Sequence, residues 1–178
     1  MSGRDKQTVR LEMKARAAAL SPEYRAAAGR IIREKLFALP AYGKAGTLMA
    51  YVSLPSEPDT YELISRAAAE GRTILLPRCA DDGLMEAVPF TGWARMRRNA
   101  YGIPEPLGAA AAEPPDLILV PCLAATAEGV RLGHGAGYYD RFLRNQPGAR
   151  ICLCFRAMLA DALPEDSWDV PMDLVLTE

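Results

Sequence analysis

The chain has 178 residues, of which 50% are hydrophobic and 24% are charged, and its formal net charge is −1. This length and composition are typical of one soluble globular domain, which we expect to span residues 1–178. A charge so close to zero argues against a protein that binds polyanions, so we expect no nucleic-acid partner and only small anionic ligands.

The cysteines and the apolar segments bear on where the protein works. The four cysteines are Cys79, Cys122, Cys152 and Cys154, and they form no C-x-x-C motif that would suggest zinc. Cys152 and Cys154 alternate within an apolar run, so both thiols should be buried on one face of a strand. The first ten residues show no apolar signal-peptide core, and the longest apolar run, 117–125, is too short to span a bilayer. We therefore expect a cytoplasmic protein with reduced thiols and no membrane partner.

Two helices are predicted at the start of the chain. The apolar spacing over 5–20 indicates an amphipathic helix, and Lys6 and Arg10 lie four residues apart on one face of it. On the residues alone, we interpret these cations as part of a solvated face. Ser21 is suited to cap a second helix that begins at Pro22 and continues to about residue 39.

A β-α-β unit follows these helices. The hydrophobic pattern predicts a strand, a helix and a strand in turn, over 46–52, 60–70 and 73–76. Asp59 with Glu62 is suited to cap the helix. Glu57 lies in the loop that leaves the first strand, and loops at the carboxyl ends of strands bind ligands in open α/β sheets. Glu57 is therefore a candidate site residue, although an acidic loop residue is more often merely solvated.

The middle of the chain reads less regularly. Asp81-Asp82-Gly83 predicts the turn of a hairpin whose second strand covers 84–90. The segment 91–115 is rich in glycine, proline and alanine, and should be the least regular part of the fold. It carries three arginines and an aromatic residue, Arg95, Arg97, Arg98 and Tyr101. The sequence leaves open whether these side chains belong to a solvated loop or contact an anion and an aromatic ring.

The remaining elements complete an alternating pattern. They are a buried strand over 116–121, a helix over 138–144, a strand over 150–155, a short helix near 158–163 and a terminal strand over 173–177. Strands that alternate with helices predict the α/β class. We expect a three-layer α/β/α sandwich with a largely parallel sheet and helices on both faces.

The densest functional motif lies between the strand at 116–121 and the helix at 138–144. Gly133, Gly135 and Gly137 stand at every second position, with Arg131 before them and Asp140 after them. Glycines let backbone N–H groups turn inward around an anion, and a following helix N-terminus adds positive charge. The spacing matches neither the dinucleotide fingerprint nor the Walker pattern, so a phosphate site and a tight structural turn both stay open on spacing alone.

The run 131–140, Arg-Leu-Gly-His-Gly-Ala-Gly-Tyr-Tyr-Asp, closely resembles the signature of the 5-formyltetrahydrofolate cyclo-ligases, also called 5,10-methenyltetrahydrofolate synthetases. Other matching pieces occur in the family's order along nearly the whole chain: Lys6 and Arg10, the run 51–53 followed by Glu57, the run 102–106, and Asp173 before 175–178. The resemblance implies a fold related to the sugar-phosphate isomerase and CoA-transferase group.

The resemblance also implies an activity in one-carbon metabolism. Enzymes of this family cyclise 5-formyltetrahydrofolate to 5,10-methenyltetrahydrofolate with ATP as co-substrate and Mg²⁺ as cofactor, and they release ADP and phosphate. The expected route phosphorylates the formyl oxygen, after which N10 attacks the activated carbon. Folate and ATP are thus the expected small-molecule partners, and we expect a monomer.

The family's functional residues transfer to this chain where its motifs match. The resemblance assigns the catalytic contacts with the ATP phosphates to Lys6, Arg10 and Arg131. The ATP-binding set is completed by Leu132, Gly133, His134, Gly135, Ala136, Gly137, Tyr138 and Tyr139. The folate would contact Val52, Glu57, His134, Gly135, Ala136, Gly137 and Tyr138. Asp140 and Asp173 would hold the metal ion. The role of His134, the one histidine, stays open.

The chain departs from the family's pattern at five positions. Cys122 stands where glycine is common, Ala125 and Thr126 replace Phe-Asp, Met158 replaces Gln, and Trp168 replaces His. These departures favour one alternative, a non-catalytic paralogue that binds folate or nucleotide. A small-molecule kinase that uses the same loop is a second alternative. An RNA-binding module is the least favoured, because aromatic-basic repeats are absent from the sequence.

Overall fold

The fold is built on a six-stranded sheet with the order β10-β9-β6-β1-β2-β3. The computed structural model describes residues 5–80 and 83–178, so the predicted turn residues Asp81 and Asp82 lie outside it. The strands are β1 (Thr47–Met49), β2 (Thr73–Cys79), β3 (Met85–Pro89), β6 (Leu117–Val120), β9 (Ala149–Leu153) and β10 (Leu174–Leu176). All neighbours pair in parallel except β2 and β3, which form the predicted antiparallel hairpin. The predicted α/β class with a largely parallel sheet is confirmed.

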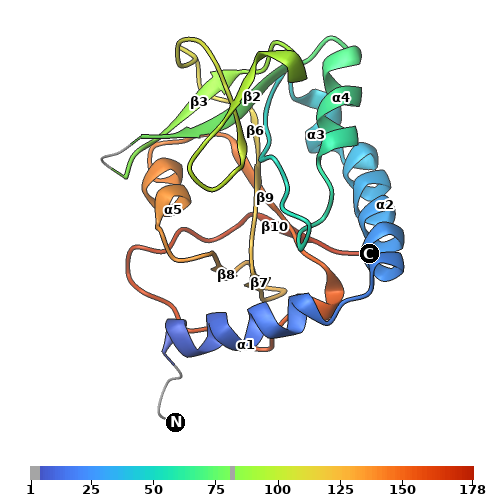
Figure 1. The fold of residues 1–178 in the computed structure, drawn as a ribbon, viewed down its shortest axis with the longest axis vertical. Helices are drawn as coiled ribbons and strands as arrows, with labels where there is room; N and C mark the ends of the chain where they lie inside the picture. The colour runs from blue at the N-terminus through green and yellow to red at the C-terminus, as the bar shows by residue number, and fades with distance from the viewer. Residues whose placement is uncertain (1–4, 81–82) are drawn as a thin grey trace.

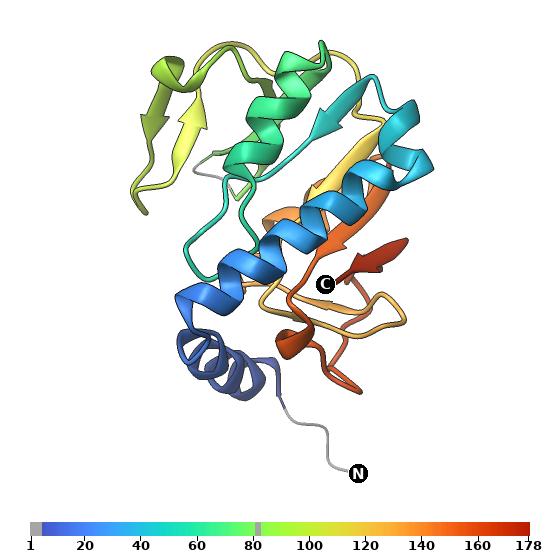
Figure 2. The same cartoon turned by 90° about the vertical axis from the view of Figure 1, so that its right-hand side faces the viewer.

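Helices cover both faces of this sheet (Figure 1). One face carries α2 (Pro22–Ala38), α3 (Pro40–Lys44) and α4 (Tyr61–Ala69), and the short α5 (Tyr138–Leu143) lies on the other. Every residue of β6 is fully buried, as expected for a strand covered on both sides. Figure 2 shows α2 lying lengthwise over the sheet, while α1 (Lys6–Ala18) sits at one end of the molecule. That end receives the carboxyl end of β6 and the small pair β7 (Ala124–Ala125) and β8 (Arg131–Leu132).

The first two helices begin where the sequence predicts. The Asp5 carboxylate accepts hydrogen bonds from the Gln7 and Thr8 N–H groups, and the Ser21 hydroxyl accepts one from the Tyr24 N–H. Pro22 occupies the first turn of α2, where the missing N–H costs nothing. The helix ends before Pro40, and its apolar stripe of Ala28, Ile32 and Leu36 is buried.

Replacing Ser21 with alanine should lower the free energy of unfolding by about 1 kcal/mol, because the Tyr24 N–H loses its acceptor. Urea denaturation followed by far-UV circular dichroism measures the change. The exposed Ser167, replaced by alanine in the same way, should leave the unfolding free energy within about 0.5 kcal/mol of the parent value. Equal effects of the two substitutions would contradict the capping role.

Two predicted strands differ in extent, and one predicted cap is incomplete. The strand predicted over 73–76 continues to Cys79. The strand predicted over 46–52 ends at Met49, because the Thr60 hydroxyl takes over the hydrogen bonding beyond it: it donates to the Tyr51 carbonyl and accepts from the Ser53 N–H. Thr60 is also the residue that precedes α4, and it makes no side-chain cap. The predicted cap by Asp59 with Glu62 is therefore only partly formed: Asp59 accepts from the Tyr61 N–H at 3.4 Å, and Glu62 pairs with Arg33 at 2.6 Å.

The short helix predicted near 158–163 is wrong. The structure has a single 3₁₀ turn, η2 (Arg156–Met158), and the chain is already extended at Leu159. The Ala160 N–H donates to the Ala125 carbonyl, so this segment adds to the β7 edge instead of continuing a helix. Tertiary pairing overrides local helix propensity here.

The segment 91–115 is more ordered than its composition indicates. It contains a 3₁₀ turn, η1 (Trp93–Arg95), and an antiparallel hairpin of β4 (Met96–Arg98) and β5 (Pro104–Pro106). The Asn99 side chain organises the turn by accepting from the Tyr101 and Ile103 N–H groups. The buried Glu105 carboxylate accepts from Asn99 and from the Cys79 N–H, which ties the hairpin to β2.

Two further predictions concern the cysteines and the membrane. Cys152 and Cys154 are both buried, as the alternating pattern predicts, and all four cysteines are free. Within the described residues, the structure has no helix with the length and hydrophobicity needed to cross a membrane.

Candidate active site

The glycine-rich loop 133–137, hereafter the glycine loop, leaves β8 and enters α5 near the carboxyl end of β6. Gly137 precedes α5 with φ +71°, and Gly135 has φ +112°, a region that side chains other than glycine avoid. At Gly133 the constraint is space, because a Cβ would come within 2.8 Å of Arg131 Nη1. The glycine spacing is therefore required by backbone conformation at two positions and by a close-packed arginine at the third.

Arg131 is held in a fixed position beneath the glycine loop. Only 9% of the residue is exposed. Its Nη2 lies 2.9 Å from Asp140 Oδ1 and its Nη1 donates to the Pro121 carbonyl at 3.2 Å. Its Nε is buried without a hydrogen-bond partner among the described residues. A buried donor without a partner is unusual in a folded protein, which marks Arg131 as a candidate functional residue.

Lys6 and Arg10 both reach the glycine loop or its surroundings from α1. Arg10 Nε donates to the Gly133 carbonyl at 3.0 Å, and its guanidinium carbon would lie 3.4 Å from a Cβ added at Gly135. Lys6 Nζ lies 2.7 Å from a carboxylate oxygen of Asp166 and 2.7 Å from one of Asp169. Burial acts to lower the pKa of Lys6, but the hydrogen bonds and charges of the two carboxylates outweigh it and raise that pKa. The interpretation of these cations as a solvated face is wrong.

The two aspartates predicted to hold a metal ion are in different environments. Asp140 lies at the start of α5, where its Oδ1 accepts from Arg131 and, at 3.4 Å, from the Val170 N–H. Asp173 precedes β10 and pairs with Arg150 at the amino end of β9, through both the side chain and the backbone N–H. Arg150 lowers the pKa of the Asp173 carboxyl. These contacts do not support a metal ion shared by Asp140 and Asp173. Asp173 lies at the amino end of β9, whereas Asp140 follows the glycine loop, near the carboxyl end of β6.

Asp169 is a carboxylate that the sequence analysis missed. The Val170 N–H that bonds to Asp140 brings the neighbouring Asp169 to the same part of the site, where Asp169 pairs with Lys6. Asp169 and Asp173 both precede the last strand, within four residues of each other. Spacing alone therefore could not tell which of them faces the glycine loop. Within the described part of the chain, no three His, Cys, Asp or Glu side chains lie close enough together to hold a metal ion.

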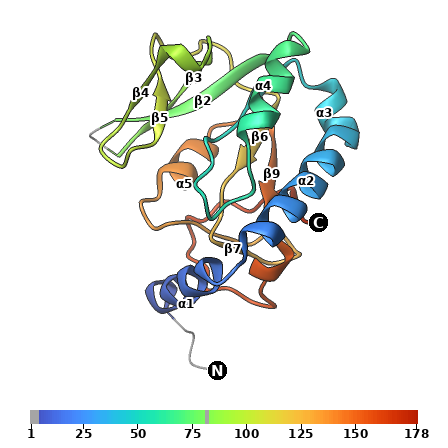
Figure 3. The same ribbon diagram turned by 45° about the vertical axis from the view of Figure 1, so that its right-hand side comes forward.

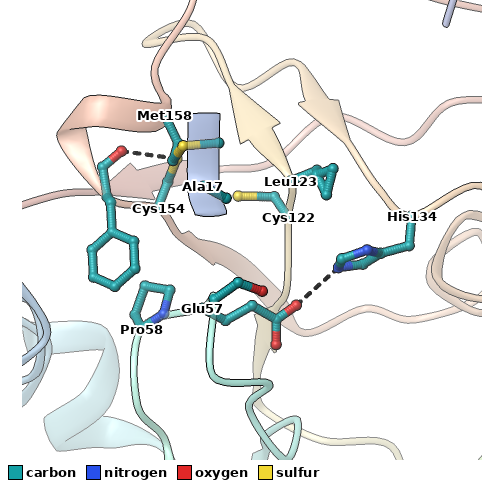
Figure 4. Close-up of a pocket in the computed structure, with 10 residues that line it drawn as sticks. Ala17, Glu57, Pro58, Cys122, Leu123, His134, Cys154 and Met158 are labelled. Atoms are coloured by element: carbon teal, nitrogen blue, oxygen red, sulfur yellow. Dashed lines mark hydrogen bonds and ion pairs between the residues drawn. The ribbon is translucent and has the colours of Figure 1, made fainter. Parts of the chain in front are cut away.

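Glu57 and His134 join the glycine loop to the loop after β1. His134 Nε2 lies 3.0 Å from Glu57 Oε1, as the dashed line in Figure 4 shows. The other Glu57 oxygen accepts from the Leu54 N–H at 2.8 Å, and only 8% of Glu57 is exposed. The role of His134 stays open, and the structure adds one contact of its ring, with this buried carboxylate.

A cavity of about 490 Å³ opens beside Glu57, a size suited to a small-molecule ligand. Its wall contains the two predicted folate contacts outside the glycine loop, Val52 and Glu57. The remaining wall comes from α2, from the start of α4 and from the β4–β5 hairpin, and it includes Arg25, Tyr61, Arg98 and Tyr101. Arg25 and Tyr61 were missed, because on their own helices they read as ordinary surface residues.

The five departures from the family pattern lie in three kinds of place. Cys122 and Met158 line a small hollow of about 10 Å³ that also borders Glu57 and His134 (Figure 4). Ala125 and Thr126 are buried in and after β7, where the Thr126 hydroxyl accepts from the Val130 N–H. Trp168 is 57% exposed, and its carbonyl accepts from Arg144. Of the five departures, only Cys122 and Met158 therefore lie beside Glu57 and His134.

The second tyrosine of the motif adds a neutral polar group to the site. The Tyr139 hydroxyl is buried and makes no hydrogen bond among the described residues. Burial, reinforced by the charge of Glu57, raises the pKa of Tyr139 well above its ordinary value. Tyr139 thus stays a neutral phenol at physiological pH, with its ring 5.8 Å from the Arg131 guanidinium carbon.

Comparisons with known proteins agree with one another. The sequence model of the 5-formyltetrahydrofolate cyclo-ligase family matches residues 2–178. A 5-formyltetrahydrofolate cyclo-ligase of Mycolicibacterium smegmatis is 32% identical, and the alignment covers 99% of this chain and 95% of that protein. The corresponding Escherichia coli protein is 28% identical over 91% of this chain and 94% of its own.

Solved structures give the same result for the fold. The 5,10-methenyltetrahydrofolate synthetase of Aquifex aeolicus superposes with a TM-score of 0.86 at 28% identity, covering 96% of this chain and 88% of that one. The synthetase of Mycoplasma pneumoniae superposes with a TM-score of 0.77 at 22% identity, covering 98% and 99% of the two chains. At 22% identity, the similarity to the Mycoplasma pneumoniae structure supports the fold alone.

Proposed function

Since this chain belongs to the 5-formyltetrahydrofolate cyclo-ligase family, its activity is the ATP-dependent cyclisation of 5-formyltetrahydrofolate to 5,10-methenyltetrahydrofolate, and we propose that the glycine loop and the neighbouring cavity carry it out. The observation that supports this placement best is the contact between His134 and Glu57. It joins a loop suited to phosphate to a cavity suited to a folate, so the γ-phosphate and the formyl group can meet at the junction.

We propose that the ATP phosphates bind at the glycine loop. Arg131 supplies a buried guanidinium with an unused Nε, and Arg10 and Lys6 approach from α1. Lys6 now pairs with Asp166 and Asp169, so a bound phosphate would compete with these carboxylates for it. Backbone N–H groups between Leu132 and Tyr139 add donors whose geometry the glycines permit.

The folate is placed with its pterin at Glu57. A pterin presents an amino group and a ring N–H side by side, which a carboxylate accepts through two oxygens. Glu57 is buried, and Leu54 and His134 fix its orientation. Val52 lies on the same wall, and the exposed Tyr101 on the hairpin can stack on an aromatic ring of the ligand.

The chemistry requires positioning more than acid–base catalysis. The formyl oxygen carries no proton, so it attacks the γ-phosphorus directly while the bond from phosphorus to the departing ADP oxygen breaks. The N10 amine then bonds to the formyl carbon and loses its proton, and inorganic phosphate leaves with the former formyl oxygen. Arg131, Lys6 and Arg10 stabilise the charge that moves from the γ-phosphate to ADP.

We further propose that Mg²⁺ is held by Asp140 together with the ATP phosphates. Mg²⁺ usually takes one or two carboxylates and completes its shell with phosphate oxygens and water, and Asp140 at the end of the glycine loop fits that requirement. Asp169 is the better candidate for a second carboxylate, because the Val170 N–H that bonds to Asp140 places Asp169 near it, whereas Asp173 pairs with Arg150 at the amino end of β9. When bound, the ion would neutralise negative charge on the phosphates.

An isotope experiment tests the proposed route. The substrate is prepared with a heavy oxygen isotope in its formyl group and is converted with ATP, after which the inorganic phosphate is analysed by mass spectrometry. The account predicts that the label appears in phosphate. Label in water, with none in phosphate, would contradict phosphorylation of the formyl oxygen, and a stable phosphorylated folate would support the kinase alternative.

Replacing Glu57 with glutamine should raise KM for 5-formyltetrahydrofolate by about tenfold to a hundredfold, since a hydrogen-bond pair to a buried charged group is worth about 1.5–3 kcal/mol. KM for ATP should change much less, because Glu57 lies on the cavity side. Steady-state kinetics with each substrate varied in turn measure both constants. The exposed Glu62, replaced by glutamine, is the control and should leave both constants unchanged. Equal increases in both constants for the Glu57 variant would contradict its assignment to the folate.

A further inference from the structure

Two arginine side chains hold the glycine loop, and only one of them, Arg10, belongs to the proposed phosphate contacts. Arg10 Nε donates to the Gly133 carbonyl at 3.0 Å. Arg141, in α5, donates through Nη2 to the Ala136 carbonyl at 2.8 Å. The first and the last part of the loop therefore each have a carbonyl oxygen bound to a guanidinium group.

Arg141 also binds a second part of the fold. Its Nε donates to the Gly83 carbonyl at 2.9 Å. Gly83 lies just before β3, which pairs with β2 and is an edge strand of the central sheet. Figure 1 and Figure 3 both show α5 next to the β2–β3 hairpin, whereas α1, which carries Arg10, lies at the lower end of the molecule. One guanidinium group thus ties the glycine loop to the edge of the sheet.

The surroundings of Arg141 fit its guanidinium group closely. A Cβ at Gly137 would come within 2.8 Å of Arg141 Nη1, and a Cβ at Gly83 would lie 3.1 Å from Arg141 Nη2. The guanidinium carbon lies 5.5 Å from the centre of the Tyr138 ring, within the range of a cation–π contact. These contacts fix a side chain that belongs to an exposed residue.

The direction of a carbonyl fixes the direction of the N–H group in the same peptide unit. A trans peptide is planar, and its C=O and N–H bonds point in opposite directions. Because the Gly133 and Ala136 carbonyls point at the arginines, the N–H groups of His134 and Gly137 point away from them. Among the described residues, neither N–H donates to a protein acceptor, so both are available to a ligand.

We propose that Arg141 is a positioning residue for ATP, which holds the Ala136 carbonyl in place so that the Gly137 N–H is directed at a phosphate oxygen. This inference rests on the proposed function, which places the ATP phosphates at the glycine loop. Arg141 acts through the loop, because two of its nitrogens are used by the Ala136 and Gly83 carbonyls. Without Arg141, a loop rich in glycine has more conformations to lose when ATP binds, and its affinity for ATP falls.

Calorimetric titration with ATP and Mg²⁺, without folate, measures this effect independently of turnover. Arg141→Met removes every donor and should weaken ATP binding about tenfold, while 5-formyltetrahydrofolate binding should change less than about twofold. Arg141→Lys can bind one carbonyl but not both, so its affinity for ATP should lie between those of the parent and the methionine variant. Arg144→Met is the matched control and should keep the parent affinity, because Arg144 follows α5 and donates to the Trp168 carbonyl instead.

Amide-proton NMR of isotope-labelled protein adds a readout that a merely structural role would not change. A hydrogen bond to a phosphate oxygen moves the resonance of an amide proton downfield. In the parent, ATP should move the His134 and Gly137 resonances downfield. In Arg141→Met, the Gly137 response should largely disappear, while the His134 response should remain because Arg10 still holds the Gly133 carbonyl.

Parent affinity for ATP in Arg141→Met would overturn the inference, and so would a Gly137 response equal to that of the parent. Equal losses of affinity for ATP and for folate would also overturn it, since they indicate a general structural role. If the parent binds ATP but forms no methenyl product, the proposed function fails and the titrations still decide the role of Arg141. A parent protein that binds no ATP would overturn both.

Discussion

Replacing Arg131 with methionine should lower kcat/KM for cyclisation by about two to three orders of magnitude, the usual effect of removing a fixed donor to a transition-state charge. Arg131 is buried beneath the glycine loop, its Nη groups contact Asp140 and Pro121, and its Nε has no partner among the described residues. Methionine matches much of the side-chain volume but carries no donor and no charge. Steady-state kinetics with ATP and 5-formyltetrahydrofolate measure the loss.

Two further variants separate a local loss from misfolding. Arg131→Lys keeps the charge but not the planar fork, so it should recover only part of the activity. Arg144, just beyond α5, donates to the Trp168 carbonyl, and Arg144→Gln should keep parent activity. Circular dichroism should show a cooperative thermal transition for all three variants. If Arg131→Met keeps activity near that of the parent, the phosphates do not bind at Arg131.

Replacing Asp140 with asparagine should lower kcat by about a hundredfold and raise the Mg²⁺ concentration needed for half-maximal activity. Asparagine keeps the shape and can still accept from Arg131 and the Val170 N–H through its amide oxygen. It lacks the negative charge that attracts a hard cation. Activity measured over a range of Mg²⁺ concentrations at fixed ATP reveals the shift.

Asp173→Asn is the matched comparison, because both aspartates were candidates on sequence grounds. Asp173 pairs with Arg150 at the amino end of β9, so its loss should leave the Mg²⁺ dependence unchanged. Asp169→Asn should raise the Mg²⁺ requirement, although less than Asp140→Asn. A larger shift for Asp173→Asn than for Asp140→Asn would restore the pairing of Asp140 with Asp173 and contradict the present assignment.

The sequence predicted well what short-range physics determines. The cap at Ser21, the proline at the start of α2, and the continuous apolar run of β6 depend on neighbours in the chain, and all are found in the structure. The glycine loop was identified for the same reason. Its glycines, its arginine and its aspartate lie within ten residues of one another, and the structure joins Arg131 to Asp140.

The sequence failed where long-range contacts decide the outcome. The β4–β5 hairpin depends on Glu105, which is buried because Cys79 on β2 and Asn99 donate to it. Asp169 and Asp173 precede the same strand, and only the path of the chain past Lys6 and Arg150 distinguishes them. Arg25 faces the cavity because a hairpin that is more than seventy residues away closes the opposite side. None of these relations has a local pattern.

The most direct test of the account follows product formation by the unmodified protein. Protein, 5-formyltetrahydrofolate, ATP and Mg²⁺ are mixed, the near-ultraviolet absorbance of the conjugated methenyl product is recorded, and ADP is quantified in the same sample. The account predicts an absorbance rise that requires both ATP and Mg²⁺, with one ADP formed per methenyl product. Folate binding by calorimetry without any absorbance rise would contradict it and would favour a non-catalytic folate-binding protein.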